Sequence, residues 1–123
     1  MTQRILVVDD QEDNRRILRD LLTASGFEVI EAKTGEESVA LAEAQIPDLI
    51  LMDIQLPGID GYEATRQIKA KPALSATPLI VVTSYALSGD EAKAFAAGAD
   101  AYVSKPFSPR ALLAKVREFL GSS

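Results

Sequence analysis

The stretch LILMD, at residues 49–53, is a run of four apolar residues that ends in a carboxylate. Apolar side chains occupy both alternating positions of the run, which is typical of a strand covered on both faces of a parallel sheet. A second run of this kind, LIVV at residues 79–82, is followed by Thr83. The two runs therefore predict the centre of a sheet that lies between two layers of helices.

Strand-like and amphipathic segments alternate along the rest of the chain, which favours βα units joined by right-handed crossovers. We expect strands near 4–8, 27–32, 48–52, 79–82 and 101–103. We expect helices at 13–25, 38–44 and 62–70, between Ser88 and Gly98, and from Pro109 to about Leu120. This order predicts an α/β fold: a flavodoxin-like, doubly wound sheet of five parallel strands, in the order 2-1-3-4-5, with five helices.

Capping and periodicity signals support these helix positions. Side chains typical of helix N-caps stand at four places: Thr34, Asp60, Ser88 and Ser108. The predicted first helix carries four apolar residues on one face: Ile17, Leu18, Leu21 and Leu22. This spacing predicts that the face packs against the sheet, and Gly26 stands where a left-handed residue would end the helix.

Length and charge limit the class of protein. A chain of 123 residues suits one domain, which we expect to span residues 1–123. The net charge is −5 and no basic stretch stands out, so we expect no nucleic-acid partner. The apolar runs are too short to cross a bilayer, and Met1 leads almost directly into a strand. We therefore expect no membrane partner and a natural start to the chain.

Cysteine and histidine are both absent. Their absence excludes disulfides, Cys/His zinc sites, Ser-His-Asp triads and cysteine nucleophiles, and the chain cannot carry a phosphohistidine of its own. The remaining chemistry must come from carboxylates, hydroxyls and lysines. A lack of cysteine also fits a cytoplasmic location.

Polar residues follow four of the predicted strands, and parallel strands would bring them to one edge of the sheet. Asp9 and Asp10 follow the first strand, Asp53 the third, Thr83 the fourth and Lys105 the fifth. Oxygen ligands at such a water-accessible edge favour Mg²⁺. Each residue alone has an ordinary alternative: acids before a helix, a turn-initiating aspartate, a structural salt bridge or an unremarkable hydroxyl.

Together these residues suit phosphoryl chemistry. A carboxylate such as Asp53 can attack phosphorus as a nucleophile, and Mg²⁺ would offset the negative charge that gathers there. Lys105 is a point cation suited to a phosphoryl oxygen. The bond from Lys105 to Pro106 is a candidate cis peptide, although the sequence leaves the isomer open.

The ordered motifs resemble those of the receiver domains of two-component response regulators. The matching segments are VVDD at 7–10, LMDIQLPGIDG at 51–61, VTS at 82–84, GA at 98–99 and YVSKPF at 102–107. They cover essentially the whole chain in the right order and at the right spacings. Through DIQLP at 53–57 the chain also resembles the single-domain, DivK-like group of this family.

The resemblance implies a role for each residue of the edge. Asp53 would be the phosphoacceptor, and Mg²⁺ would be held by Asp9, Asp10, Asp53 and the main-chain carbonyl of Gln55. Lys105 would contact the phosphoryl group. Two residues would form the switch, Thr83 by moving its hydroxyl toward the phosphoryl group and Tyr102 by turning inward behind it.

The resemblance also implies partners. A sensor histidine kinase or a histidine phosphotransfer protein would donate the phosphoryl group from its phosphohistidine. The fourth helix, fifth strand and fifth helix would then bind a downstream protein target. We expect a signalling switch rather than an enzyme, and a monomer before phosphorylation.

Three alternatives remain open at this stage. The chain could be a receiver excised from a hybrid histidine kinase or a longer regulator. It could be an aspartyl-phosphate phosphatase, although Gln55 occupies the place where such enzymes usually have a second aspartate. It could bind flavin, although Asp9 and Asp10 would repel the flavin phosphate.

Overall fold

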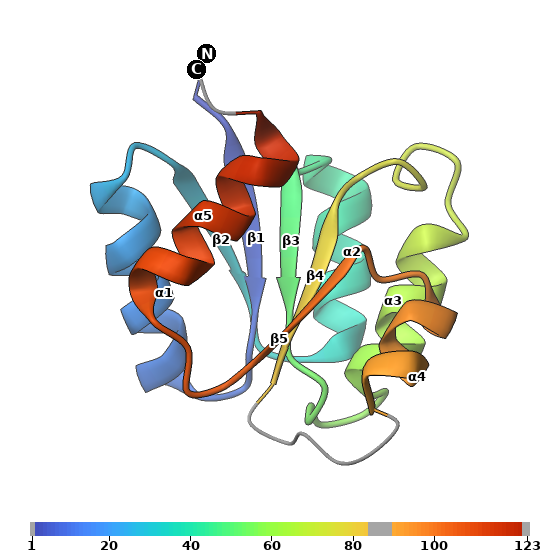
Figure 1. Cartoon of the computed structure of the whole chain (residues 1–123). Coiled ribbons are helices and arrows are strands. Elements are labelled where there is room, and N and C mark those ends of the chain that lie inside the picture. Colours follow the sequence, from blue (N-terminus) through green and yellow to red (C-terminus); the bar gives the residue numbers. More distant parts are fainter. Residues whose placement is uncertain (1, 84–89, 122–123) are drawn as a thin grey trace.

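One parallel sheet covered by helices on both faces forms the structure, which is a computed structural model that describes residues 2–83 and 90–121 (Figure 1). The strands of the described chain are β1 (Arg4–Val8), β2 (Glu28–Ala32), β3 (Leu49–Met52), β4 (Leu79–Thr83) and β5 (Ala101–Ser104). Its helices are α1 (Glu12–Ala24), α2 (Gly35–Gln45), α3 (Gly61–Lys69), α4 (Asp90–Ala97) and α5 (Pro109–Leu120).

The sheet has the predicted strand order, β2-β1-β3-β4-β5, and each neighbouring pair is parallel. β1 and β3 therefore lie side by side, with Val8 opposite Met52 at their carboxyl ends. The prediction of the fold class is confirmed. This register matters for the site because Asp9 and Asp53 are the residues that come next in the two strands.

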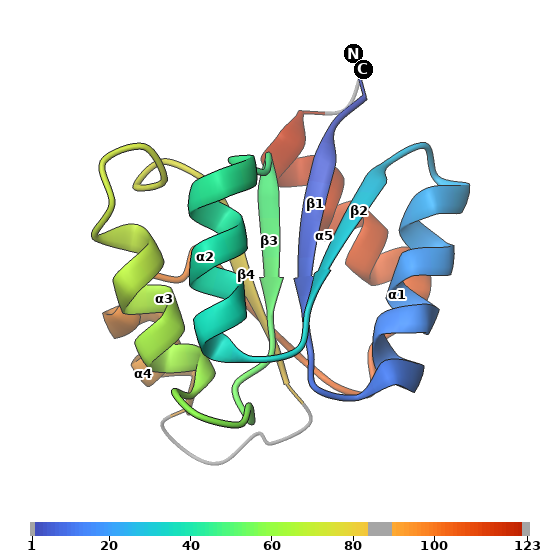
Figure 2. The ribbon, with the colours of Figure 1, turned by 180° about the vertical axis from the view of Figure 1, so that it is seen from behind.

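Two hydrophobic clusters form the core, one on each face of the sheet. In β1, Ile5 and Val7 point into one cluster, and Leu6 and Val8 point into the other. α1 and α5 complete the first cluster with four buried side chains: Leu18, Leu22, Leu112 and Val116. α2, α3 and α4 complete the second, largely with small residues: Ala42, Ala64, Ile68 and Ala94. Figure 2 shows α2 and α3 covering this second face.

Three of the predicted N-caps are confirmed. Thr34, Asp60 and Ser108 each accept a hydrogen bond from a main-chain N–H three residues later, at 2.9 to 3.0 Å. The fourth predicted cap, Ser88, lies outside the described residues. α2 begins at Gly35, directly after its cap, rather than at residue 38. Gly26 has φ +94° and follows the end of α1 as predicted.

One predicted core residue of α1 is wrong. Leu18 and Leu22 are buried and Leu21 is half-buried, but Ile17 is 58% exposed. The buried stripe of α1 runs instead through Arg15, Leu18 and Leu22, at helical spacing. The apolar stripe is therefore narrower than the sequence suggests, because a charged residue takes a core-facing position.

The two ends of the described chain lie together, at the end of the sheet where β1 and β3 begin (Figure 1). The side-chain amide of Gln3 donates to the carbonyl of Leu120 at 3.4 Å, which joins the approach to β1 to the last turn of α5. In the described ranges, every helix falls short of the length and apolar character needed to cross a bilayer.

Candidate functional site

Three carboxylates lie together at the carboxyl edge of the sheet, as predicted. One oxygen from each of Asp9, Asp10 and Asp53 lies within 4.8 Å of the other two. The parallel ladder brings them together because it continues past the strands. The Asp9 N–H donates to the Ala32 carbonyl at 3.1 Å, and the Asp53 N–H donates to the Val8 carbonyl at 3.0 Å. Asp9 and Asp53 are buried, whereas Asp10 is exposed.

Burial shapes the acidity of Asp53, which is 8% exposed. Loss of solvation raises the pKa of Asp53 to about 6, and the neighbouring Asp9 carboxylate acts in the same direction. The Lys105 ammonium and a main-chain hydrogen bond from Ile54, at 2.7 Å to Oδ1, oppose this rise. The anionic form of Asp53 is thus disfavoured here, and a bound cation would stabilise it.

Lys105 provides positive charge to the cluster from the loop after β5. Its ammonium donates to Asp9 Oδ2 at 3.0 Å and lies 3.9 Å from Asp53 Oδ2. Its main-chain N–H donates to the Thr83 carbonyl at 2.7 Å, which fixes the loop against the end of β4. The Lys105–Pro106 peptide is cis. One ammonium facing three carboxylates leaves the cluster with a net negative charge.

The two predicted switch residues lie on β4 and β5. Thr83 is the last residue of β4 and is buried at the same edge as the acids. Tyr102, in β5, is half-buried and packs against the cluster under α2, α3 and α4. Burial raises the pKa of Tyr102, and the carboxylates of Asp90 and Glu91 at the start of α4 add to the rise. Tyr102 therefore lies close enough to the start of α4 to sense its acidic side chains.

Gln55 is exposed in the loop that leaves β3. Hydrogen bonding from its main chain lowers the pKa of Asp53, alongside the bond from Ile54. The loop thus wraps around the Asp53 carboxylate, and Gln55 is close enough for its main chain to take part in the site.

Sequence reasoning missed the role of Gly61, the first residue of α3. A Cβ atom at this position would lie 2.1 Å from the Asp53 carbonyl oxygen and 2.7 Å from the Ile54 Cα. The Gly61 N–H donates to the Ile54 carbonyl at 2.9 Å. Gly61 therefore lets α3 pack directly against the backbone that carries Asp53. The Asp60 cap immediately before it was the available signal.

Sequence reasoning also missed two residues of α1 that contact Asp9. Arg15 donates to the Asp9 carbonyl at 2.8 Å, and the Asn14 amide lies 3.5 Å from Asp9 Oδ1. The signal for Arg15 was its spacing from Leu18 and Leu22, which places a charged side chain in the buried stripe of the helix.

An apolar cavity of about 320 Å³ opens beside Lys105, between α1 and the loop that leads into α5. Its lining residues are Asn14, Ile17, Leu18, Lys105, Pro106, Phe107 and Pro109. The exposed Ile17 side chain lies in this wall. The cavity shares Lys105 with the acidic cluster, whose three aspartates do not line it.

The donor set of the cluster fits Mg²⁺. Carboxylate oxygens are ligands that Mg²⁺ prefers, and the ion usually takes one or two carboxylates and keeps several waters. The exposed Asp10 leaves the cluster open to solvent on one side, where those waters could lie. Neutralising this charge next to Asp53 is the chemistry that the arrangement allows.

A family model described as the response regulator receiver domain matches residues 5–117. The polar-differentiation response regulator DivK of Brucella ovis is 42% identical over 123 residues, and the match covers all of both chains. The corresponding protein of Brucella anthropi is 41% identical over the same length.

Solved structures also resemble the chain over almost its whole length. The receiver domain of a Pseudomonas aeruginosa sensor histidine kinase has a TM-score of 0.92 and 37% identity, covering 99% of this chain and 100% of its own. That structure has a magnesium ion coordinated in its active site cleft. A response regulator from Chloroflexus aurantiacus has a TM-score of 0.93 and 31% identity, with 99% and 100% covered.

Proposed function

The chain belongs to the receiver domains of response regulators, which accept phosphoryl groups in two-component signalling, and we propose that Asp53 is the residue that accepts the phosphoryl group here. One observation carries the proposal: the buried Asp53 carboxylate lies within reach of both Asp9 and Lys105. We further propose that residues 1–123 act as one receiver domain.

The donor is a phosphohistidine on a sensor histidine kinase or a histidine phosphotransfer protein. In the transfer, the bond from phosphorus to the histidine nitrogen breaks while a bond to an Asp53 oxygen forms. The electron pair leaves with the imidazole nitrogen. Lys105 contacts the oxygens of the phosphoryl group during this step, which stabilises their charge. Mg²⁺ held by Asp9, Asp10, Asp53 and the Gln55 carbonyl supplies further neutralisation when it is bound.

Phosphorylation then acts on the output face through Thr83 and Tyr102. The group adds charge and strong acceptors, and the Thr83 hydroxyl gains a contact that exists only in the phosphorylated state. α4 is anchored mainly by alanines, and its bulkiest apolar side chain, Phe95, is 45% exposed. Sparse anchoring lets α4 shift at low cost.

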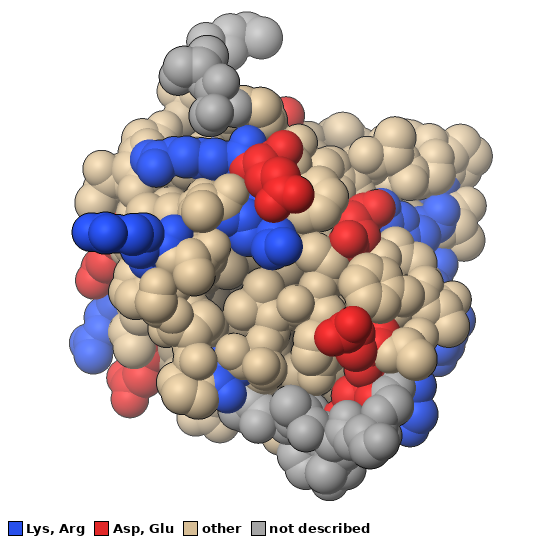
Figure 3. All heavy atoms as spheres, in the orientation of Figure 1, with Lys and Arg blue, Asp and Glu red and all other residues tan. Residues whose placement is uncertain are grey.

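A protein target fits the surface of α4, β5 and α5. On this face, acidic side chains lie over α4 and the approach to β5, and basic side chains lie around α5 (Figure 3). Mixed charges of both signs favour a protein partner over nucleic acid. We place the chain in the cytoplasm, as a monomer before phosphorylation.

Incubation with acetyl phosphate and Mg²⁺, followed by intact-mass measurement, tests the phosphoacceptor. Wild type should gain one alkali-labile phosphoryl group, and chelation of Mg²⁺ should prevent the gain. Asp53→Asn should gain none, whereas Asp20→Asn, an exposed aspartate of α1, should behave as wild type. Unmodified wild type across a range of donor and Mg²⁺ concentrations would sink the proposal.

Amide exchange with and without beryllofluoride tests the switch. Wild type should change its protection in α4 and β5 when beryllofluoride binds. Thr83→Ala should still bind beryllofluoride but show a smaller change, and Thr83→Ser, which keeps the hydroxyl, should retain most of it. Equal changes in all three proteins would remove Thr83 from the switch.

The rival function is an enzyme that turns over an aspartyl-phosphate intermediate. It would release phosphate steadily from a small phosphomonoester at a rate far above the loss of phosphate from the isolated phosphoprotein. The phosphoacceptor proposal predicts a stoichiometric gain without such turnover. A malachite-green assay on the same samples separates the two.

A further inference from the structure

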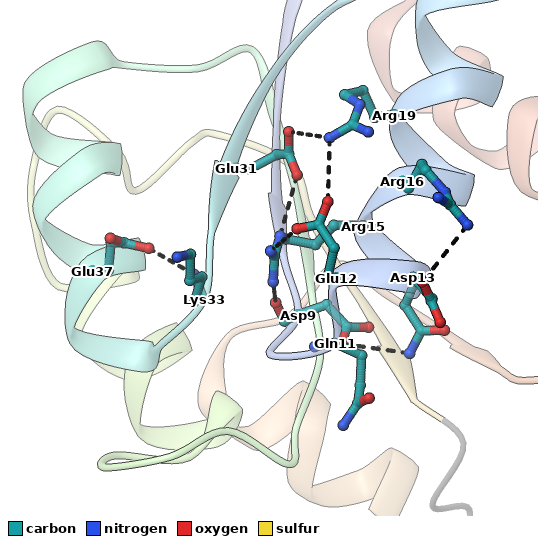
Figure 4. Close-up of polar contacts among 11 residues, drawn as sticks. Asp9, Gln11, Glu12, Asp13, Arg15, Arg16, Arg19, Glu31, Lys33 and Glu37 are labelled. Atoms are coloured by element: carbon teal, nitrogen blue, oxygen red, sulfur yellow. Dashed lines mark hydrogen bonds and ion pairs between the residues drawn. The ribbon is translucent and has the colours of Figure 1, made fainter.

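A buried arginine stands behind the metal-binding edge. Arg15 is 4% exposed and lies on the inner side of the first turns of α1. Its guanidinium group uses three different nitrogens for three partners, as Figure 4 shows. Nη1 donates to the Asp9 carbonyl at 2.8 Å, Nε donates to Glu31 at 3.2 Å, and Nη2 donates to Glu12.

The bond to the Asp9 carbonyl acts on both neighbouring acids. That carbonyl belongs to the peptide unit between Asp9 and Asp10, which is planar, so fixing its oxygen also fixes the N–H of Asp10. The direction in which the Asp10 side chain leaves the backbone depends on this plane. Arg15 therefore orients the backbone of two of the three carboxylates in the cluster.

Other contacts hold Asp9 at different atoms. The Gln11 N–H donates to its Oδ1 at 2.9 Å, and Lys105 donates to its Oδ2 at 3.0 Å. The Asp9 N–H is part of the sheet ladder. The carbonyl oxygen is the remaining polar atom of the residue, and Arg15 donates to it. Removing Arg15 would therefore leave the Asp9 carbonyl without this donor, while the other polar atoms of Asp9 keep their partners.

The charge of Arg15 is balanced by two acids that are not part of the cluster. Glu12 and Glu31 both pair with it, and Arg19 reaches the same two carboxylates at 4.0 and 2.9 Å. An unbalanced guanidinium beside the edge would repel Mg²⁺. Pairing with Glu12 and Glu31 limits that repulsion, so Arg15 can hold the backbone without opposing the metal.

We propose that Arg15 is a positioning residue for the metal site, which holds the Asp9–Asp10 peptide in the orientation that Mg²⁺ binding requires. The proposal rests on the proposed function of Asp9 and Asp10. The planar fork of an arginine suits three acceptors in different directions, and a lysine cannot reach all three at once. Outer contacts that orient metal ligands typically contribute about 10–100-fold to metal affinity.

Calorimetric titration with Mg²⁺ at about pH 7.5 tests this role in the full chain. Arg15→Met should weaken Mg²⁺ binding by roughly 10–100-fold. Arg15→Lys should weaken it several-fold. Arg19→Met is the matched control, because it removes an arginine that shares Glu12 and Glu31 but does not contact Asp9. It should leave the Mg²⁺ affinity close to that of wild type.

A second measurement needs no metal. In metal-free protein, amide exchange at Asp10 and Gln11 should be faster in Arg15→Met than in Arg19→Met, after correction for any difference in global stability. A purely structural role would lower the stability of both variants and change neither the Mg²⁺ affinity nor this local exchange.

The results distinguish a failure of the proposed role of Arg15 from a failure of the proposed Mg²⁺ site. If wild type binds no Mg²⁺, both the metal site and the role of Arg15 fail. If wild type binds Mg²⁺ and Arg15→Met binds it equally well, only the role of Arg15 fails. If Arg15→Met does not fold, Arg15→Lys decides: weakened binding supports the inference, and unchanged binding overturns it.

Discussion

Two lysine–aspartate pairs lie at opposite ends of the same sheet, and they differ in charge balance. Lys69 lies 2.9 Å from Asp100 where β4 and β5 begin, and Lys105 lies 3.0 Å from Asp9 where β1 and β3 end. Both lysine side chains are largely buried, at 13% and 17% exposure. The two ion pairs therefore have similar lengths and similarly buried lysines, although they lie at opposite ends of the sheet.

The Lys69 pair is complete in itself. Its ammonium also donates to the carbonyls of Thr77 and Ser75, so that its three donors have three acceptors. Asp100 accepts a further bond from the Leu79 N–H at 2.9 Å. Charges cancel and hydrogen bonds are satisfied, so this end holds α3, β4 and the turn before β5 together.

The charges around the Lys105 pair, by contrast, do not cancel. Its ammonium contacts Asp9 and lies near Asp53 in a cluster of three carboxylates, and the pKa of Asp53 is raised to about 6. The excess negative charge favours a bound cation, and the proposed phosphoryl transfer depends on the neutralisation that such a cation would supply. The matched charges at Lys69 and Asp100 thus hold parts of the fold together, whereas the unmatched charges around Lys105 leave a place for a cation.

The largest expected effect is on phosphorylation. Lys105→Ala should lower the rate of phosphorylation by acetyl phosphate by roughly 10²–10³-fold, because a donor to the phosphoryl oxygens is lost. Lys69→Ala should leave the rate of its folded fraction unchanged. Time courses of intact mass measure both rates. A comparable loss in Lys69→Ala would break the distinction between the two ends.

Stability should separate the lysines in a second way. Lys69→Ala should lower the free energy of unfolding by about 2–3 kcal/mol, because Asp100 and two carbonyls lose their donor. Added Mg²⁺ should not restore this loss beyond its effect on wild type. Urea unfolding with and without Mg²⁺ provides the measurement.

Lys105→Ala should behave differently in the same experiment. Loss of its ammonium leaves Asp9 buried without its cation, so the metal-free protein should be destabilised by about 3 kcal/mol. Mg²⁺ should offset most of that loss by replacing the missing charge. A Mg²⁺-insensitive loss would place Lys105 with Lys69 as a purely structural residue.

The raised pKa of Asp53 predicts the pH dependence of the metal-free protein. The folded protein binds this proton more tightly than the unfolded chain, whose pKa is 3.8. Its contribution to stability is therefore fully present below about pH 4 and is lost as the pH rises through about 6, by about 3 kcal/mol in all. Denaturant titrations between pH 4 and 7 should show this fall in the free energy of unfolding for wild type but not for Asp53→Asn.

Mg²⁺ should reverse the sign of that slope, because the metal favours the deprotonated cluster. Binding should tighten as the pH rises through about 6. A metal-free wild type whose stability matches the pH profile of Asp53→Asn would show that burial does not perturb this carboxyl group.

The smallest expected effects concern helix caps near the two ends of the site. Asp60→Ala and Ser108→Ala should each cost about 1 kcal/mol of stability, because each leaves a main-chain N–H without its acceptor. Asp60 precedes Gly61, which packs on the Asp53 backbone, so its loss should also weaken Mg²⁺ binding slightly. Ser108→Ala should not change Mg²⁺ binding.

Sequence patterns predicted the features of the fold and the site that depend on the order of residues along the chain. Alternating periodicities located the strands, and strand order alone brought Asp9, Asp10 and Asp53 together, because parallel strands end at one edge. Thr83 and Tyr102 acquired roles only through the family resemblance, since a hydroxyl or a tyrosine at a strand is ordinary by itself.

The parts that sequence reasoning missed depend on contacts between distant segments. Arg15 is buried because Glu31, on β2, and the Asp9 carbonyl receive it, and neither partner is apparent from the helix. The need for Gly61 depends on the path of the loop after Asp53. The burial of Ile17 was predicted wrongly for a related reason. The buried face of α1 runs through Arg15, Leu18 and Leu22, and a pattern of apolar residues alone does not reveal that an arginine belongs to it.

The meeting of Gln3 with Leu120 has a practical consequence for engineering. Both ends of the described chain lie where β1 and β3 begin (Figure 1), whereas Asp53 follows the end of β3. A fluorescent protein or an affinity tag fused at either end would lie on that side of the molecule, away from the acidic cluster and from Lys105. A short peptide linking the two ends would span little distance, so a circular permutant opened in a surface loop at the remote side should keep the phosphorylation chemistry intact.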